Sequence, residues 1–266
     1  MSHYIHGSAP EEQARLTRLN ELINIRCFAQ VKLNAGERVL DMGSGLGQFT
    51  FKLAQTVGPS GFCLGIERDE QQRTTAIKNF VSPNLEFRQG DVTKLPLSQS
   101  EIGSFDFVHM RFLLEHLPNP AQAIAQAHHA LKVGGRILLF DDDHETMVLY
   151  PEPVGFKELW TAYMDTYVEV GNDPYIGRKM PKLLHEQGFK QLRNDVVFFG
   201  DCYGTETFPW FVANLAEVIA TSKEILLSAN LITERAFTAA IENIYGWAKN
   251  PHASMWYTIA VAEGVK

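Results

Sequence analysis

A glycine-rich turn after a short apolar run constrains the fold of this chain more than any other feature of its sequence. The run 39–41 ends in an acid, glycines follow at Gly43, Gly45 and Gly47, and an apolar helical pattern resumes at Phe49. Glycine accepts positive φ angles and lets the backbone approach a ligand with no Cβ between them. In an open α/β sheet, a turn of this kind at the carboxyl end of the first strand is where nucleotide-like ligands bind. The sequence therefore predicts an α/β fold with a ligand site at this turn.

Short apolar runs alternate with helix-length segments through the first half of the chain. An amphipathic helical pattern over 11–33 precedes them. The predicted strands are 38–42, 62–66, 85–88, 105–109 and 136–140, and the predicted helices between them are 49–57, 70–80 and 121–131. Strands separated by helices imply right-handed crossovers and a mostly parallel sheet.

The alternation of strands and helices stops in the second half of the chain. The sequence there predicts helices at 156–170 and 180–187, a strand at 196–199, a mostly helical stretch over 205–249 and a last strand at 256–262. The last two strands could add antiparallel pairing at the sheet edge, as mixed sheets commonly do. We therefore expect a doubly wound, mostly parallel, seven-stranded Rossmann-like sheet with an antiparallel edge strand and a helical lid or insertion.

We expect the chain to form a single domain, because no linker clearly divides residues 1–266. Its predicted parts are an N-terminal helical lid over 1–35, a ligand-binding core over 36–145, and substrate-side helices and strands over 146–266, with an insertion at 204–250.

The composition excludes several classes of protein. Of the 266 residues, 45% are hydrophobic and 21% are charged, which is an ordinary globular balance. The net charge of −7 and the lack of a basic stripe disfavour a nucleic-acid partner. No apolar run is long enough for a membrane span, and the N-terminus lacks a signal-peptide pattern. The three widely spaced cysteines suggest neither a disulfide framework nor a zinc site, so we predict a cytoplasmic protein.

Three ligands compete for the glycine turn. A phosphate-binding P-loop requires a Lys-Ser/Thr pair after its glycines, and the turn has none. A dinucleotide site requires a small residue where this chain has Gln48. Asp41, directly before the turn, would repel a pyrophosphate but would suit a ligand with cationic groups. S-adenosylmethionine, which carries a sulfonium and an ammonium group, fits these residues best.

The motif Asp41-x-Gly43-x-Gly45-x-Gly47 resembles the first motif of class I S-adenosylmethionine-dependent methyltransferases, small-molecule branch. Further matches to that family follow in order at 65–69, 89–92, 114–120 and 131–136. About 20 residues after the turn, Glu67 closes the second strand, where an acid binds the ribose hydroxyls in nucleotide-binding folds. Asp69 is the rival acid, but we expect it to cap the next helix.

The resemblance implies the other contacts of the cofactor. Asp91 would accept from the adenine amino group beside the Val92 amide, and Met110 and Arg111 would lie along the methionine moiety. Tyr4 and Arg15 would fold over the cofactor from the N-terminal segment. The complete predicted cofactor site is Tyr4, Arg15, Asp41, Gly43, Ser44, Gly45, Gly47, Glu67, Arg68, Asp91, Val92, Met110 and Arg111.

Methyl transfer from a sulfonium is an in-line displacement, so the main catalytic effect expected is orientation. An acceptor that starts protonated also needs a base, and His109 and His116 are the candidates we name first. Other titratable side chains at the ends of the fourth and fifth strands are Glu115, Asp141, Asp142, Asp143 and His144. Adjacent carboxylates at 141–143 cannot all converge on one ion, so we expect a solvated loop there and no metal.

Aromatic side chains suggest the class of acceptor. They recur at helical spacing over 156–167 and again at 208–211. Such a lid suits a small organic acceptor that is aromatic or lipidic, and the long insertion suits a sizeable substrate or a homodimer. The alternatives are an S-adenosylmethionine-binding protein without transfer activity, cyclase-like or regulatory, because cofactor site and reaction are separable, and, less favoured, a NAD-dependent dehydrogenase.

Overall fold

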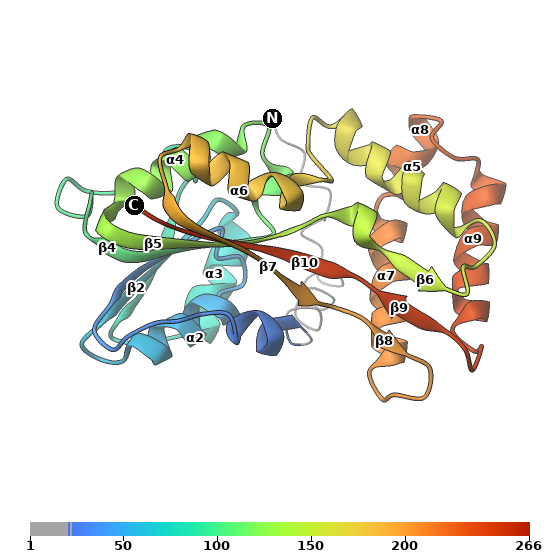
Figure 1. The fold of residues 1–266 in the computed structure, drawn as a ribbon, viewed down its shortest axis with the longest axis horizontal. Helices are drawn as coiled ribbons and strands as arrows, with labels where there is room; N and C mark the ends of the chain where they lie inside the picture. The colour runs from blue at the N-terminus through green and yellow to red at the C-terminus, as the bar shows by residue number, and fades with distance from the viewer. Residues whose placement is uncertain (1–20, 22) are drawn as a thin grey trace.

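Two sheets and their helices build the described part of the chain, residue 21 and residues 23–266 of a computed structural model (Figure 1). The larger sheet has seven strands in the order β3-β2-β1-β4-β5-β10-β7, and the smaller has three in the order β6-β9-β8. The strands are β1 (Arg38–Met42), β2 (Phe62–Glu67), β3 (Leu85–Gln89), β4 (Phe105–Arg111), β5 (Leu131–Asp142), β6 (Val148–Tyr150), β7 (Lys190–Phe198), β8 (Asp201–Cys202), β9 (Ser254–Trp256) and β10 (Thr258–Val265).

Helices cover both faces of the larger sheet and pack on one side of the smaller one (Figure 1). The α-helices are α2 (Gln48–Val57), α3 (Glu70–Asn79), α4 (Pro120–Ala130), α5 (Phe156–Glu169), α6 (Ile176–Glu186), α7 (Phe208–Thr221), α8 (Lys223–Ser228) and α9 (Glu234–Trp247), and the short 3-10 helices are η1 (Leu114–His116) and η2 (His144–Thr146). On the larger sheet, α4 and α6 lie on one face and α2 and α3 on the other (Figure 1). The doubly wound arrangement predicted from the sequence is confirmed.

The strand before the glycine turn is buried on both faces, as a central strand of a parallel sheet must be. β1 pairs in parallel with β2 and with β4, and four of its five residues are buried. This pairing sets Asp41 of β1 directly beside His109 of β4. The carboxyl ends of the two strands therefore carry both side chains to one edge of the sheet.

The glycine turn packs too closely for side chains. Gly43, Gly45 and Gly47 all have positive φ, and Gly47 at +85° caps the N-terminus of α2. A Cβ on Gly47 would lie 2.8 Å from the Cβ of Ala76 in α3 and 2.8 Å from the ring of Phe87 in β3. Glycine at this position therefore satisfies both the backbone conformation and the packing of the turn against α3 and β3.

The antiparallel strand predicted at the sheet edge is confirmed, and it lies one place in from the outermost strand. β10 pairs antiparallel with β5 on one side and with β7 on the other. β5 is much longer than the predicted 136–140, because it runs for 12 residues toward the smaller sheet. β9 and β10 follow each other almost without a break, so the same segment of chain enters both sheets (Figure 1).

A helical lobe packs beside the smaller sheet (Figure 1). The helices α7, α8 and α9 occupy the predicted helical stretch 205–249, whereas the short strands β6 and β8 were not predicted. One apolar cluster connects this lobe with the larger sheet, since it contains Leu53 of α2, Phe140 of β5, Phe211 of α7 and Met255 of β9. The two sheets therefore share a core.

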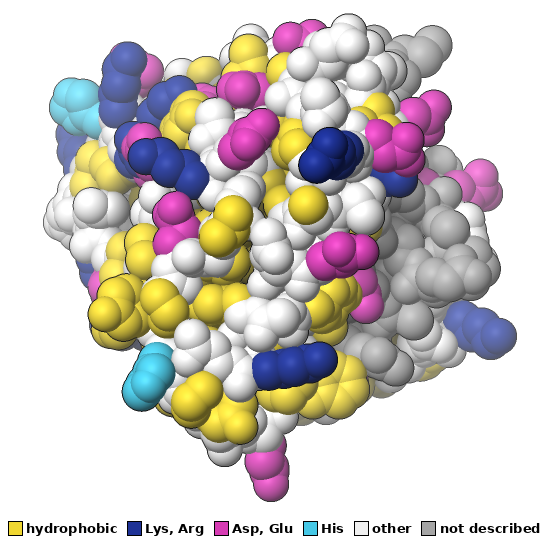
Figure 2. Space-filling model, turned by 90° about the vertical axis from the view of Figure 1, so that its right-hand side faces the viewer, with side chains coloured by type: hydrophobic (Ala, Val, Ile, Leu, Met, Phe, Trp, Pro, Cys, Tyr) yellow, Lys and Arg dark blue, Asp and Glu magenta, His cyan; other side chains and the backbone are white. Residues whose placement is uncertain are grey.

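The outer face of the helical lobe mixes hydrophobic side chains with acidic and basic ones (Figure 2). Among the described residues, the helices are all too short or too polar to cross a bilayer. Cys27 and Cys63 are buried free thiols, whereas Cys202 is an exposed one.

Candidate active site

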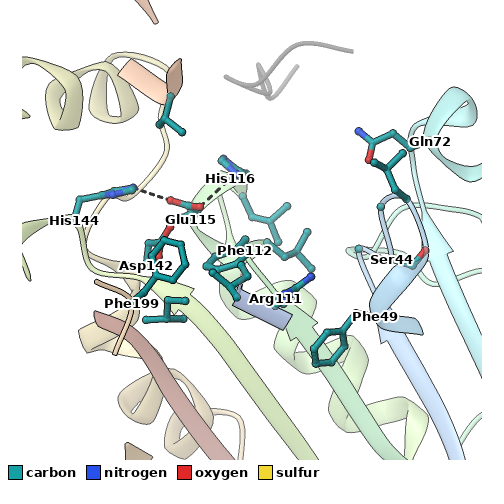
Figure 3. Close-up of a pocket in the computed structure, with 18 of the residues that line it drawn as sticks. Ser44, Phe49, Gln72, Arg111, Phe112, Glu115, His116, Asp142, His144 and Phe199 are labelled. Atoms are coloured by element: carbon teal, nitrogen blue, oxygen red, sulfur yellow. Dashed lines mark hydrogen bonds and ion pairs between the residues drawn. The ribbon is translucent and has the colours of Figure 1, made fainter. Parts of the chain in front are cut away.

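One cavity of about 650 Å³ runs from the glycine turn to the helical lobe. At one end it is lined by the turn, by the end of β2 and by the loop after β3, and at the other by side chains of α5, α7, β9 and β10. Figure 3 shows Ser44 and Gln72 on one wall and His144 and Phe199 across from them. Ligand cavities for small molecules usually measure roughly 300–1,000 Å³, so this one has the size of a small-molecule site.

Glu67, the predicted ribose ligand, ends β2 and lines the cavity. Its Oε2 accepts from the Gly45 amide at 2.9 Å, and its Oε1 accepts from the Asp69 amide at 2.8 Å. Burial raises the pKa of Glu67, and the backbone amides partly oppose that shift. Asp69 accepts from the Gln72 amide at 2.8 Å and caps α3, which confirms its predicted role. Glu67 therefore connects the glycine turn with the end of β2.

Asp91, the predicted adenine acceptor, is exposed at the edge of the same cavity. Its Oδ1 accepts from the Thr93 hydroxyl at 2.7 Å and from the Thr93 amide at 2.8 Å. These hydrogen bonds lower the pKa of the Asp91 carboxyl. Asp91 thus offers an ionised carboxylate on the cavity wall next to Val92, which also lines it.

Asp41 is buried, and both of its oxygens bind partners within the chain. Oδ2 accepts from the Thr50 hydroxyl at 2.6 Å, and Oδ1 lies 2.7 Å from Nδ1 of His109. The His109 ring stacks on Phe49 at 4.5 Å between centroids, and among the described residues its Nε2 is buried without a hydrogen-bond partner. The predicted contact of Asp41 with a cationic ligand therefore competes with these internal bonds, although both residues line the cavity.

Neighbouring residues of β4 point in opposite directions, which separates Met110 from the cavity. Arg111 lines the cavity, donates to Asn24 at 2.8 Å and places its guanidinium 4.6 Å from the centroid of Phe49. Met110 is fully buried in the apolar cluster on the other face of the sheet and does not line the cavity. The predicted contact between the Met110 side chain and the methionine moiety was wrong.

Most of the other predicted cofactor residues lie at the cavity. Gly43, Ser44, Gly45 and Arg68 line the cavity, and Gly47 supports the turn from behind without lining it. The predictions for Tyr4 and Arg15 fall outside the described residues.

His116, the second predicted base, is buried on η1 at the middle of the cavity. Its Nε2 lies 3.4 Å from Oε1 of Glu115. Burial, together with the nearby His144 and Arg68, lowers the pKa of His116 to about 3. A histidine with this pKa is a neutral and very weak base at physiological pH.

Glu115 and His144 form the centre of a buried polar cluster that also contains Tyr257. His144 Nε2 lies 3.0 Å from Glu115 Oε2, and His144 Nδ1 lies 3.1 Å from the Tyr257 hydroxyl. Figure 3 shows Glu115 between His144 and His116. Burial raises the pKa of Glu115 to about 8, against the opposing effect of a hydrogen bond with Tyr167. The Trp160 indole donates to the His144 carbonyl at 2.7 Å and fixes the backbone of η2.

The predicted solvated loop at 141–143 was wrong, because these carboxylates are used by the fold. Asp141 is fully buried and accepts from the amides of Leu113 and Leu114 at 3.2 and 2.8 Å. Asp143 is buried and binds the Arg178 guanidinium. Asp142 lines the cavity.

Asp142 also approaches the polar cluster. Donor atoms of Glu115, Asp142 and His144 lie within 4.8 Å of one another, a spacing at which they could hold a metal ion. The sequence named these three residues together, as titratable groups at the ends of the fourth and fifth strands, but it could not show that their side chains meet. Tyr257 was missed: it lay inside the last predicted strand, 256–262, whereas in the structure it stands between β9 and β10.

Comparisons with known proteins agree with this geometry. Residues 33–197 match a family described as Methyltransferase domain. The chain is 31% identical over 190 residues to an uncharacterized 37.1 kDa protein in transposon TN4556 of Streptomyces fradiae, over 69% of this chain and 53% of that protein. It is 30% identical over 159 residues to demethylmenaquinone methyltransferase of Lactococcus lactis, over 59% of this chain and 58% of that enzyme. The chain therefore spans little more than half the length of these two relatives.

A solved structure supports the same fold. The YcgJ protein of Bacillus subtilis superposes with a TM-score of 0.57 at 16% identity, over 93% of this chain and 98% of that protein. Because the family match extends over more than half of its residues, this chain belongs to the methyltransferase-domain family.

Proposed function

We propose that this chain binds S-adenosylmethionine at the glycine turn and transfers its methyl group to a small organic acceptor. The observation that carries the proposal is the continuous cavity from the turn to the helical lobe, because methyl transfer needs two ligands in line. Membership of the methyltransferase-domain family supports it.

The residues at the turn end of the cavity fit the cofactor. An ionised carboxylate has about four acceptor sites, so Glu67 can accept from a ribose hydroxyl while it keeps its backbone donors at Gly45, Arg68 and Asp69. Asp91, on the cavity wall beside Val92 and Arg68, would accept from the adenine amino group. The bare backbone of Gly43 and Gly45 would face the methionine moiety, with Arg111 beyond it, and Tyr4 and Arg15 remain proposed lid contacts.

The lobe end of the cavity fits an aromatic or lipidic acceptor. Its walls carry Trp160, Tyr163, Phe199, Phe211, Leu215, Val218 and Met255. Large apolar side chains of this kind bind planar or lipidic molecules and exclude water. The Lactococcus lactis relative is named for a small-molecule substrate, which is consistent with this class of acceptor.

The chain contributes mainly orientation to the chemistry. The bound cofactor supplies an activated methyl group on its sulfonium. The walls of the cavity hold the nucleophile in line with that group and keep water out, and such positioning lowers barriers by up to about 10 kcal/mol in well-oriented systems. His109 and His116 remain the bases that the sequence proposes.

Isothermal titration calorimetry tests the proposal. We expect binding of S-adenosylmethionine and S-adenosylhomocysteine and none of NAD. Glu67→Gln should weaken S-adenosylmethionine about tenfold or more, since a hydrogen bond to a charged group contributes about 1.5–3 kcal/mol. Glu242→Gln, on the exposed side of α9, is the matched control and should bind like the unchanged chain. Binding of NAD alone would contradict the proposal.

The non-methylating alternative, cyclase-like or regulatory, makes a different prediction. Binding of S-adenosylmethionine without transfer to any acceptor would favour it. A homodimer and a cytoplasmic location remain predictions, and sedimentation velocity tests the first of them.

A further inference from the structure

We propose that Glu115, positioned by His144, is the base that removes the proton from a hydroxyl group of the acceptor. The chain would therefore methylate oxygen on a planar, hydroxylated molecule. The inference rests on the proposed function, since it concerns the acceptor end of the same cavity.

The hydrogen bonds around His144 orient the Glu115 carboxylate. His144 Nε2 lies 3.0 Å from Glu115 Oε2, and His144 Nδ1 lies 3.1 Å from the Tyr257 hydroxyl, so contacts at both ring nitrogens hold the imidazole beside the carboxylate. The other carboxylate oxygen, Oε1, has His116 Nε2 at 3.4 Å, outside the usual 2.7–3.2 Å range of such hydrogen bonds. A carboxylate has about four acceptor sites, so Glu115, which also hydrogen-bonds with Tyr167, keeps acceptor capacity for a hydroxyl group in the cavity that it lines.

The surroundings of this carboxylate restrict what it can meet. Apart from Asn214 and the tyrosine hydroxyls, the walls nearby are aromatic and aliphatic, so the acidic side chains concentrate at the cluster of Glu115, Asp142 and His144. A flat molecule that buries its ring against Trp160 and Tyr163 would bring one polar substituent to that cluster. A hydroxyl group needs a base before it attacks, whereas a neutral amine attacks through its lone pair. The cluster thus suits an oxygen nucleophile.

The charges around Glu115 adjust its basicity. Titratable groups face it from its own helix, from β5, from η2, from α5 and from the segment before β10, and they are His116, Asp141, Asp142, His144, Tyr167 and Tyr257. Burial raises the pKa of Glu115 to about 8. A general base works best with a pKa near the pH at which it operates, and burial is the usual way to raise that of a glutamate.

The two histidines proposed from the sequence fit this role less well. His109 lies beside Asp41 and stacks on Phe49 at the cofactor end of the cavity. The pKa of His116 is about 3, so it holds an abstracted proton far more weakly than a group with a pKa near neutrality.

The step balances without a further reactant. The Glu115 carboxylate takes the hydroxyl proton as the acceptor oxygen forms a bond to the methyl carbon and the carbon–sulfur bond breaks. The products are the methyl ether, S-adenosylhomocysteine and a protonated Glu115, which then loses its proton to solvent.

Methyl transfer to matched naphthalene probes tests the inference. The protein is incubated with methyl-labelled S-adenosylmethionine and either 1-naphthol or 1-naphthylamine, and the products are separated by chromatography. We expect the methyl ether of 1-naphthol as the main product. Glu115→Gln should lower kcat by roughly 100-fold or more, the usual contribution of a general base, and should leave the Kd for S-adenosylmethionine within twofold. Glu242→Gln is the matched control.

The pH profile separates a base from a merely structural residue. The rate with 1-naphthol should rise with pH to a plateau, with an apparent pKa near the value of about 8 for Glu115, because the base must be ionised. In Glu115→Gln this rise should disappear. In His144→Phe it should shift along the pH axis, because the carboxylate loses the imidazole that contacts it at 3.0 Å.

Several outcomes would overturn the inference. These are a preference for 1-naphthylamine, transfer to neither probe, a wild-type rate in Glu115→Gln, or activity that EDTA abolishes and Mg²⁺ restores, which would make the cluster a metal site. Calorimetry with S-adenosylmethionine separates failure of the proposed function from failure of this inference. Absence of binding would contradict the proposed function itself, whereas normal binding together with any of these outcomes would contradict only the role of Glu115.

Discussion

Asp41 and His109 face each other across the neighbouring strands β1 and β4, and the carboxylate of one meets the imidazole of the other at 2.7 Å. The second oxygen of Asp41 accepts from Thr50 in α2 at 2.6 Å. One buried acid therefore ties together two strands and the helix that follows the glycine turn. An acid at this position stabilises the turn through its internal hydrogen bonds, whether or not a ligand is bound.

Thr50→Val should destabilise the protein by about 1–3 kcal/mol, because it removes a buried hydrogen bond to a carboxylate. Thr56→Val is the matched control on the same helix, since the Thr56 hydroxyl donates to the Lys52 carbonyl in an exposed position. Urea unfolding followed by circular dichroism measures both variants. Equal losses of stability in the two variants would show that the buried hydrogen bond between Thr50 and Asp41 contributes no more to stability than the exposed one of Thr56.

Gly47→Ala should be more damaging than an alanine elsewhere at a glycine of similar φ. The new methyl group would lie 2.8 Å from Ala76 and from the Phe87 ring, and such overpacking costs about 1–3 kcal/mol. The positive φ adds about 1–2 kcal/mol. Gly171→Ala is the control, because its φ is +77° and nothing lies within 4 Å of its Cβ position. The free energy of unfolding in urea should fall further for Gly47→Ala, and the reverse order would refute the packing argument.

The part of the site that follows from local sequence was predicted well. Glu67 closes β2 and Asp69 caps α3, because a strand end and a helix start depend on neighbouring residues. Met110 was assigned wrongly, although alternation along a strand places it opposite its two neighbours. The sequence gives that alternation, but not which face of the sheet carries the ligand.

The acceptor end required the folded structure. Glu115, His144 and Tyr257 come from three distant segments, and no local pattern records their meeting. The strands β6 and β8 have three and two residues, and their pairing with β9 joins segments far apart in the sequence. The acids at 141–143 look like a polar loop by composition, yet amide donors and an arginine compensate their burial.

His116→Gln should reduce the dependence of stability on pH in mildly acidic solution. Burial lowers the pKa of His116 to about 3, whereas an unfolded histidine has a pKa of about 6.5. Between these values the unfolded state binds a proton that the native state does not, so stability falls as the pH falls from about 6.5 toward 3.

The unchanged chain should therefore lose up to about 1.4 kcal/mol more per pH unit than His116→Gln in this window. Denaturant titrations between pH 7 and pH 4 measure the two slopes. His252→Gln, at an exposed position, is the control and should keep the slope of the unchanged chain. Parallel curves for His116→Gln and the unchanged chain would refute the prediction.

Tyr257→Phe should disturb the acceptor end without touching the glycine turn. The change leaves Nδ1 of the buried His144 without its hydroxyl partner, which costs about 1–3 kcal/mol of stability. Transfer to 1-naphthol should fall, because His144 then orients Glu115 less well, while the Kd for S-adenosylmethionine stays unchanged. Tyr245→Phe, exposed on α9, is the control. A loss of cofactor affinity in Tyr257→Phe would mean that the two ends of the cavity are not independent.

The position of β10 between β5 and β7 affects how the chain folds while it is being synthesised. A ribosome makes β9 and β10 after every other described element, and these strands complete both sheets. Nascent chains therefore hold the edges of β5 and β7 open until residues 254–265 emerge from the exit tunnel. Unpaired strand edges are templates for pairing with other chains. Protection by chaperones during translation should thus matter more for this protein than for one whose central strands are made early.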